Sequence, residues 1–187
     1  EVASHLGARL EIFLVRKLGT PDHEEFAMGA IATGGLWFVN DEVTRQLNIS
    51  QQQIQQIVER EERELERRAE VYGDEFSRGE VRNEIVILID DGLATGSTMR
   101  AAVAALKQKQ PAKIVIGVPV ASASTCDKLE KEVDELVCLK MPEDFSAVGE
   151  WYEDFSQTSD AEVCELLKRA KEQFALAPVP PLWPAGF

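Results

Sequence analysis

Unbroken apolar runs alternate along this chain with stretches in which apolar residues recur every three to four positions. Ile85–Ile89 and Lys113–Val120 are largely apolar, as strands buried on both faces of a parallel sheet are. Ser97–Gln108 lies between them and is rich in alanine, which favours a helix. This order predicts an α/β fold, in which helices flank a doubly wound, mainly parallel sheet.

The same pattern predicts the other elements of the fold. Leu10–Val15 is expected to form a buried parallel strand, and Glu135–Leu139 a further strand. Capping residues and helical spacing predict five more helices: Glu1–Leu6 with Gly7 as its stop, one capped by Asn40 or Asp41, a longer one capped by Ser50, Thr125–Val133, and Asp160–Phe174.

Two segments differ from this strand–helix alternation. Gly19–Glu25 is polar and is expected to be a loop, and Met28–Ala32 and Leu36–Val39 are short apolar stretches around a glycine-rich turn, which indicates a small hairpin. Residues 177–187 hold four of the eight prolines and are expected to be a tail or linker, which leaves 1–176 as one domain. Because a parallel unit should begin with a strand, the helix at residue 1 suggests that the chain starts inside a structural unit.

The charge composition limits the kinds of partner that the protein can bind. The 187 residues include 20 Lys and Arg against 33 Asp and Glu, a net charge of −13, which argues against nucleic acid or an anionic membrane as a partner. Phosphate ligands are still possible, because loops and helix ends bind phosphate through backbone N–H groups. The three cysteines are widely spaced and odd in number, which indicates reduced thiols in a cytoplasmic protein.

The segment from Val86 to Thr98, VILIDDGLATGST, concentrates the chemistry of this sequence. A strand delivers Asp90 and Asp91 to the carboxyl edge of the sheet, where carboxylates can accept hydrogen bonds from sugar hydroxyls or help to hold Mg²⁺. Two glycines allow close approach of a ligand, and hydroxyl side chains precede the positive N-terminus of a helix. Together these features predict a site for a ribose that carries a 5′-phosphate, with a divalent metal. No Lys follows the second Gly as a P-loop requires, and GxGxxG is absent.

This segment resembles the phosphoribosyl-pyrophosphate (PRPP) motif of the type I phosphoribosyltransferases. The resemblance implies that Asp90 and Asp91 are the catalytic residues that hold the ribose and the metal. It also places the 5′-phosphate in a loop of five residues: Ala94, Thr95, Gly96, Ser97 and Thr98. Arg16 and Lys17 would contact pyrophosphate, and the segment around Thr20–Val39 would be the family's flexible loop.

The resemblance extends from Leu10 to about Phe155 and includes the segments VRKLG, GAIATGG and WYEDF. Over this range the chain is similar to bacterial members of the family that have no assigned base. It implies a hood over the base, in which Phe145 stacks on the base and the backbone at Val148 reads its edge. Glu153 would lie near the metal. The alternative is that the aromatic residues of this region pack against the edge of the sheet.

The chain departs from the family pattern in two ways. Ala94 stands where the enzymes for 6-oxopurines have an Asp that contacts the base, so an activity of that type is not expected. The family's first strand and pyrophosphate loop do not precede the first helix, so weak pyrophosphate binding is expected.

The resemblance thus implies Mg²⁺-dependent transfer of a 5-phosphoribosyl group from PRPP to a nitrogenous base, with release of pyrophosphate. PRPP and a small-molecule base would be the ligands, and the assembly is expected to be a homodimer. Two alternatives remain: a regulatory domain that senses PRPP without chemistry, and a domain that the proline-rich tail joins to another domain in longer relatives.

Overall fold

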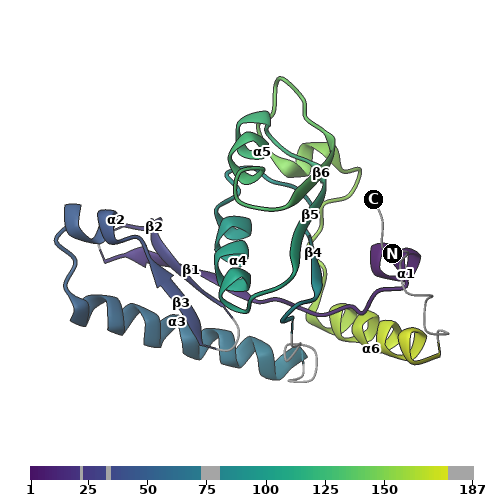
Figure 1. The fold of residues 1–187 in the computed structure, drawn as a ribbon, viewed down its shortest axis with the longest axis horizontal. Helices are drawn as coiled ribbons and strands as arrows, with labels where there is room; N and C mark the ends of the chain where they lie inside the picture. Colours follow the sequence, from purple (N-terminus) through teal and green to yellow (C-terminus); the bar gives the residue numbers. More distant parts are fainter. Residues whose placement is uncertain (22, 33–34, 73–80, 177–187) are drawn as a thin grey trace.

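The computed structural model describes residues 1–21, 23–32, 35–72 and 81–176, and these form two three-stranded sheets (Figure 1). The first sheet is antiparallel, in the order β1 (Val15–Thr20), β2 (His23–Ala32), β3 (Leu36–Val39). The second is parallel, in the order β4 (Ile85–Ile89), β5 (Lys113–Val120), β6 (Glu135–Lys140). The predicted α/β fold, with a parallel sheet flanked by helices, is confirmed.

Six α-helices and one short 3₁₀-helix lie within the described residues. They are α1 (Val2–Leu6), α2 (Asp41–Gln46), α3 (Gln51–Tyr72), α4 (Ser97–Gln108), α5 (Ala123–Leu129), η2 (Val148–Trp151) and α6 (Asp160–Leu176). None of these helices has the length and apolar composition needed to cross a membrane.

The helix ends follow from side chains that satisfy free backbone groups. Gly7 ends α1 in the left-handed conformation, with a φ of 59°. Asn40 caps α2 by accepting a hydrogen bond from the Glu42 N–H at 2.9 Å. Ser50 and Gln53 form a capping box at α3, in which the Ser50 N–H donates to Gln53 Oε1 at 2.9 Å and the Gln53 N–H donates to Ser50 Oγ at 3.3 Å.

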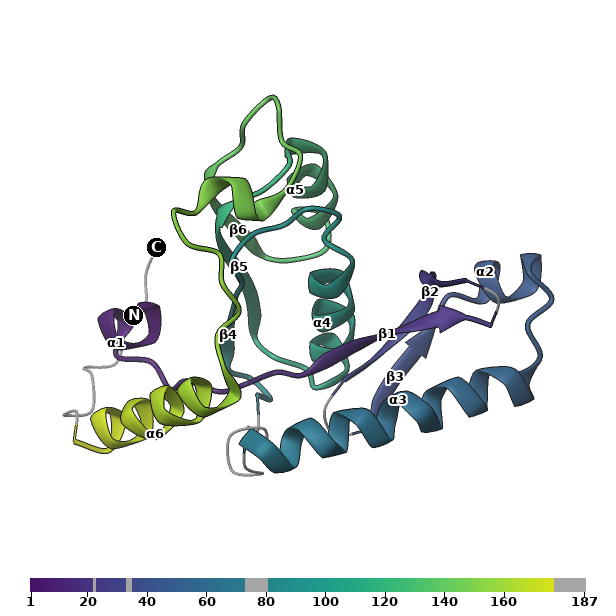
Figure 2. The ribbon, with the colours of Figure 1, turned by 180° about the vertical axis from the view of Figure 1, so that it is seen from behind.

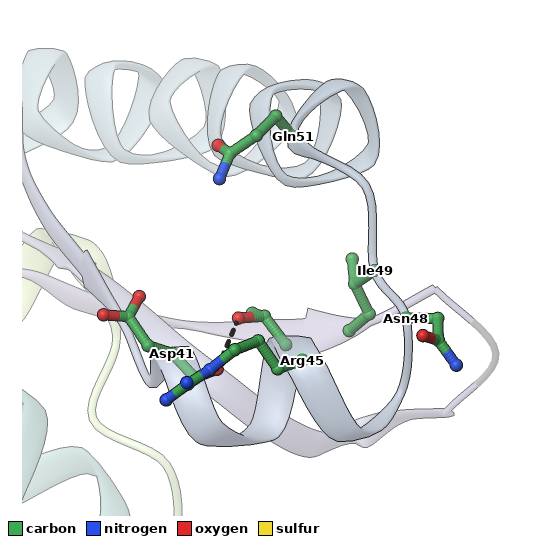
Figure 3. A pocket seen from close by; sticks show the side chains of 6 residues that line it. Asp41, Arg45, Asn48, Ile49 and Gln51 are labelled. Atoms are coloured by element: carbon green, nitrogen blue, oxygen red, sulfur yellow. Dashed lines mark hydrogen bonds between the residues drawn. The ribbon is translucent and has the colours of Figure 1, made fainter.

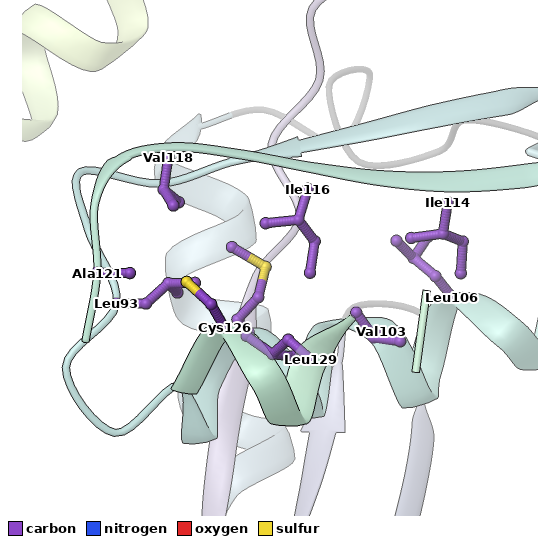
Figure 4. Packing of buried hydrophobic residues seen from close by; sticks show 10 residues of the cluster. Leu93, Val103, Leu106, Ile114, Ile116, Val118, Ala121, Cys126 and Leu129 are labelled. Carbon is purple, nitrogen blue, oxygen red and sulfur yellow. The ribbon is translucent and has the colours of Figure 1, made fainter. Parts of the chain in front are cut away.

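One face of the parallel sheet is covered by α4 and α5 (Figure 4). Side chains from these helices interdigitate with inward-facing side chains of β5, and together they form the larger hydrophobic core. Its fully buried members include Val103, Leu106, Ile116, Cys126 and Leu129.

The opposite face of the parallel sheet carries large apolar side chains that stay open to solvent. Successive residues of a strand point to opposite faces, so Ile85, Ile87 and Ile89 share one face of β4, and Val137 and Leu139 share one face of β6. Their exposed fractions run from 39% for Ile87 to 81% for Leu139. Among the described residues, nothing covers these five side chains fully, so they form an accessible apolar surface.

The antiparallel sheet has a core of its own. Leu18, Met28 and Ile31 are at most 1% exposed and pack against the apolar stripe of α3, which is Ile54, Ile57, Val58 and Leu65. All three strands of this sheet also contact α4, so that α4 joins the two halves of the molecule (Figure 1).

Helix α6 lies beside the end of α3 and next to α1, as the view from behind shows (Figure 2). Two hydrogen bonds fix this arrangement: the Tyr72 hydroxyl donates to Asp160 Oδ1 at 2.7 Å, and the Cys164 thiol donates to the carbonyl oxygen of Val71 at 3.3 Å. The last turn of the 22-residue α3 is thereby tied to the C-terminal helix.

The prediction of a parallel strand at Leu10–Val15 is wrong. The strand begins at Val15, where that run ends, and pairs antiparallel with β2. Phe13 packs against the core of the parallel sheet, whereas Leu14 packs against the core of the antiparallel sheet. The apolar run therefore marks a half-buried connection between two cores, and such a segment needs apolar side chains without needing strand partners.

One further expectation is corrected in the antiparallel sheet. The polar stretch Gly19–Glu25 is not an open loop, because β1 continues to Thr20 and β2 begins at His23. The segment expected to be the family's flexible loop contains β2 and β3, with Met28 and Ile31 buried, and its mobility stays a prediction. The expected hairpin is confirmed, with Ala32 paired to Leu36, whereas the proline-rich tail at 177–187 lies outside the described residues.

We predict that Met28→Ala destabilises the protein by about 2–5 kcal/mol, because it leaves a cavity at a fully buried position of β2. Phe26→Ala in the same strand is the matched control, since Phe26 is 55% exposed, and it should change the stability by less than about 0.5 kcal/mol. Urea unfolding of both variants measures the difference. Equal stabilities would contradict the assignment of a second core to this sheet.

Candidate functional site

Two adjacent carboxylates stand at the carboxyl end of β4, where the sequence predicts them. The backbone N–H of Asp91 donates to Asp90 Oδ1 at 3.0 Å, which turns the first side chain back over the start of the loop. Partial desolvation raises the pKa of Asp90, although its side chain is exposed; the hydrogen bond from Asp91 opposes the shift, and the negative charge of Asp91 adds to it. The folded state therefore holds the ionised form of Asp90 at some cost in free energy.

The loop that follows the acids is fastened to β5 and α5. The Leu93 N–H donates to the carbonyl oxygen of Val120 at 3.0 Å, and the Ser122 N–H donates to that of Leu93 at 3.2 Å. The Thr125 hydroxyl donates to the carbonyl oxygen of Ala94 at 2.7 Å, and Ser122 Oγ donates to the same oxygen at 3.3 Å. These bonds fix the path of the loop before any ligand arrives.

The N-terminus of α4 opens into this loop. The first bond of the helix runs from the Arg100 N–H to the carbonyl oxygen of Gly96 at 2.9 Å, so the preceding helical N–H groups have no partner within the helix. Thr95 Oγ1 and Ser97 Oγ lie 2.9 Å apart, and Thr98 is exposed. Backbone donors, hydroxyls and the positive end of the helix dipole thus occur together, which is the arrangement that binds phosphate.

Gly96 is required by the packing of the protein itself, and not only by the space that a bound phosphate would need. Its φ is 68°, and a Cβ at this position would lie 2.6 Å from Thr125 Cγ2. The glycine therefore allows α4 to approach α5 closely, and any side chain here disturbs the packing of the loop as well as its ligand.

The hood predicted after β6 is docked directly on the acid loop. A Cβ on Gly92 would lie 2.7 Å from Val148 Cγ1, so Val148 occupies the space that Gly92 leaves open. The Tyr152 hydroxyl donates to the carbonyl oxygen of Asp91 at 2.6 Å. Burial raises the pKa of Tyr152, and the charges of Asp91 and Asp90 raise it further, so the phenol remains a donor.

The aromatic residues of the hood pack partly against one another. The rings of Tyr152 and Phe155 lie 5.3 Å apart at an interplanar angle of 42°, and Phe155 fills the space over Gly149. Phe145 is half-buried. Its predicted role in stacking on a base stays a prediction, as does that of the backbone at Val148.

The two basic residues predicted for pyrophosphate are placed on β1. Arg16 Nε lies 2.5 Å from Glu61 Oε2 of α3, and Arg60 Nε lies 2.9 Å from the other oxygen of that carboxylate, which is only 8% exposed. Lys17 is exposed and, as the next residue of the strand, points to the opposite face. Arg16 is therefore engaged in neutralising a buried acid of α3.

The predicted metal ligands are only partly brought together. In the described part of the chain, no three His, Cys, Asp or Glu side chains converge as a metal cluster would require. Glu153 is exposed and does not complete a three-carboxylate set with Asp90 and Asp91. The two aspartates offer the hard oxygen donors that suit Mg²⁺, whose other positions are commonly filled by water and substrate phosphates.

The three cysteines are free. Burial raises the pKa of Cys126 to about 11, and the neighbouring Cys138 contributes to this shift. A thiol with such a pKa stays protonated at neutral pH, which makes Cys126 a core residue rather than a nucleophile.

A wide hollow of about 670 Å³ lies elsewhere, between α2 and the start of α3 (Figure 3). Asp41, Arg45 and Gln51 are among the residues that line it, and Arg45 Nε donates to the carbonyl oxygen of Asp41 at 2.9 Å. It contains none of the predicted site residues.

Sequence reasoning missed the residues that hold the loop and the hood in place. Ser122 and Thr125 follow β5, and Tyr152 follows η2, so none belongs to the thirteen-residue motif. The topology could have predicted Ser122 and Thr125, because side chains just after the next parallel strand lie at the same edge of the sheet as the acids.

Comparison with known proteins agrees with this geometry. The chain matches the family model described as "Phosphoribosyl transferase domain" over residues 2–155, and it belongs to that family. It is 38% identical over 177 residues to "Putative phosphoribosyl transferase Rv0571c" of Mycobacterium tuberculosis H37Rv, and equally to the protein named in the same way from strain CDC 1551. The match covers 95% of this chain but 40% of each relative, so the chain spans about two fifths of their length.

A solved structure shows the same fold. The crystal structure of TT1426 from Thermus thermophilus superimposes with a TM-score of 0.81 at 36% sequence identity. The superposition covers 90% of this chain and 79% of that one.

We predict that Asp90→Asn keeps the fold and leaves the melting temperature unchanged or higher at pH 7. The folded state raises the pKa of Asp90, so ionisation at neutral pH opposes folding, and the neutral amide removes that penalty. The gain should disappear below about pH 3.9, where the carboxyl is protonated in both states. Thermal melts at the two pH values measure it, and a marked loss of stability at pH 7 would contradict the shift.

We predict that Gly96→Ala destabilises the protein by about 1–3 kcal/mol, from the positive φ and the contact with Thr125 Cγ2. Thr125→Ser removes that methyl group and keeps the hydroxyl that bonds Ala94, so it should restore part of the loss. Gly7→Ala is the control for backbone strain alone, because Gly7 has a φ of 59° and a Cβ added there would meet no atom within 4 Å. Urea unfolding of the variants tests this, and the absence of rescue would contradict the proposed contact.

Proposed function

We propose that this chain binds PRPP and transfers its 5-phosphoribosyl group to a nitrogen nucleophile, with release of pyrophosphate. One observation carries the proposal: a carboxylate pair and the open N-terminus of α4 meet in a loop that Val120, Ser122 and Thr125 hold in place and the hood covers. Membership of the phosphoribosyl transferase domain family supports the same reading.

Each part of the loop has a role in this proposal. Asp90 and Asp91 accept hydrogen bonds from the ribose hydroxyls, and the loop from Ala94 to Thr98 binds the 5′-phosphate through backbone N–H groups and hydroxyls. The same two carboxylates would hold Mg²⁺, which would neutralise charge on the departing pyrophosphate.

The transfer needs no covalent bond to the protein. The C1′–O bond breaks and its electron pair leaves with pyrophosphate, while the nitrogen lone pair forms the new C1′–N bond and the acceptor gives up a proton. Positive charge develops on the sugar during this step, and the nearby carboxylates stabilise it. The hood bound to Asp91 through Tyr152 helps to exclude water from the reacting carbon.

A regulatory domain that binds PRPP without turnover is the second candidate. Two observations favour it: Ala94 has no group that can move a proton, and Arg16 is paired with Glu61 rather than free for pyrophosphate. The two candidates share the ligand and differ in whether the C1′–O bond breaks.

The decisive experiment measures PRPP binding by calorimetry and pyrophosphate release with a panel of bases, both with Mg²⁺. We predict that Asp90→Asn combined with Asp91→Asn weakens PRPP binding by about 100-fold or more, because charge-assisted hydrogen bonds to the ribose are lost. Asp127→Asn, an exposed substitution on α5, is the control for the loss of a surface carboxylate and should bind PRPP as the parent does.

Three outcomes separate the readings. Binding with pyrophosphate release that depends on a base supports the transferase. Binding without release from any base favours the regulatory domain. No binding by the parent chain, or equal binding by the double variant, would overturn both.

A further inference from the structure

A small hollow of about 210 Å³ lies at the carboxyl ends of β5 and β6, where five residues line it: Pro119, Val120, Lys140, Trp151 and Tyr152. None of these residues is among those predicted from the sequence to bind a ligand. The volume is below the range of about 300–1,000 Å³ that is usual for drug-sized ligands, so it suits a single small ring.

This hollow shares its walls with the acid loop. Tyr152 donates its hydroxyl to the carbonyl oxygen of Asp91 at 2.6 Å, and the Val120 carbonyl oxygen accepts the Leu93 N–H at 3.0 Å. The hollow is therefore next to the loop that carries the two aspartates, on the side of the hood.

The side chains that line the hollow offer mostly apolar, flat surfaces, together with one cation. Pro119, Val120 and the two aromatic side chains supply surfaces against which a planar ring can pack. Lys140 Nζ lies 4.3 Å from the centre of the Trp151 ring, a cation–π contact.

Lys140 has no carboxylate partner among the described residues, although the chain carries a net charge of −13. In contrast, Lys113 on the neighbouring strand is paired with Glu135 at 2.7 Å. An ammonium group held on an aromatic ring beside a hollow is suited to an anionic ligand, because a charge-assisted hydrogen bond is roughly twice as strong as a neutral one.

We propose that this hollow is the acceptor subsite and that its ligand is a planar nitrogen heterocycle bearing a carboxylate, which Lys140 binds. The name acceptor subsite rests on the proposed function. The preference of the hollow for an anionic ring does not depend on that function. A neutral ring would leave the ammonium without an anionic partner, so Lys140 determines specificity through binding and does not take part in the chemical step.

The test uses two matched pairs of probes that differ in the carboxylate: orotate against uracil, and nicotinate against nicotinamide. Each is titrated into the full chain by calorimetry, with and without PRPP and Mg²⁺. The parent should bind the carboxylate member of each pair at least about 10-fold more tightly. Lys140→Met should bring that ratio close to one, and Lys140→Arg, which keeps the charge, should retain most of it.

Lys168→Met is the control, since Lys168 is exposed on α6 and its loss changes the net charge in the same way. It should leave the ratio unchanged. Equal affinity for the acid and neutral members in the parent overturns the inference, as does a ratio that survives in Lys140→Met. If the parent fails to bind PRPP, the proposed function falls, and the ratio measured without PRPP still decides whether this hollow selects anions.

Discussion

The hydrogen bond from the Thr125 hydroxyl to the Ala94 carbonyl oxygen is the contact on which the arrangement of the site depends. It fixes the loop between β4 and α4 against α5, in the space that Gly96 leaves for the methyl group of Thr125. Because the loop is fixed, the acids before it and the helix N-terminus after it keep one relative position. Ligand binding then costs little conformational entropy, because the loop is already ordered.

The site belongs to the parallel half of the molecule, and the antiparallel half has a hydrophobic core of its own. Leu18, Met28 and Ile31 pack on α3, and the buried Glu61 is neutralised by Arg16 and Arg60. Helix α4 connects the halves, since its N-terminus lies at the acid loop while its body contacts the strands of the antiparallel sheet. Helix α4 therefore belongs both to the candidate site and to the packing of the antiparallel sheet.

The sequence predicted the parallel half well because local and global preferences agree there: β4, α4 and β5 begin and end at the predicted residues. It failed at Leu10–Val15, where burial between two cores imitates a strand pattern. The family resemblance assigned Arg16 to pyrophosphate, whereas its pairing with Glu61, 45 residues away, leaves no trace in a linear pattern. The family motif identified the acids, whereas the hydroxyls of Ser122 and Tyr152 that support them depend on tertiary contacts.

The apolar face of β4 and β6, which the described residues leave accessible, has a consequence for how these residues behave in solution. Ile85, Ile89 and Leu139 are each more than half exposed, and such surfaces attract one another. The net charge of −13 keeps copies apart at low ionic strength, where repulsion acts over about 30 Å in 0.01 M salt. In 1 M salt that range shrinks to about 3 Å, so attraction between the apolar faces outweighs the repulsion between copies. The colloidal stability of the protein therefore depends on ionic strength.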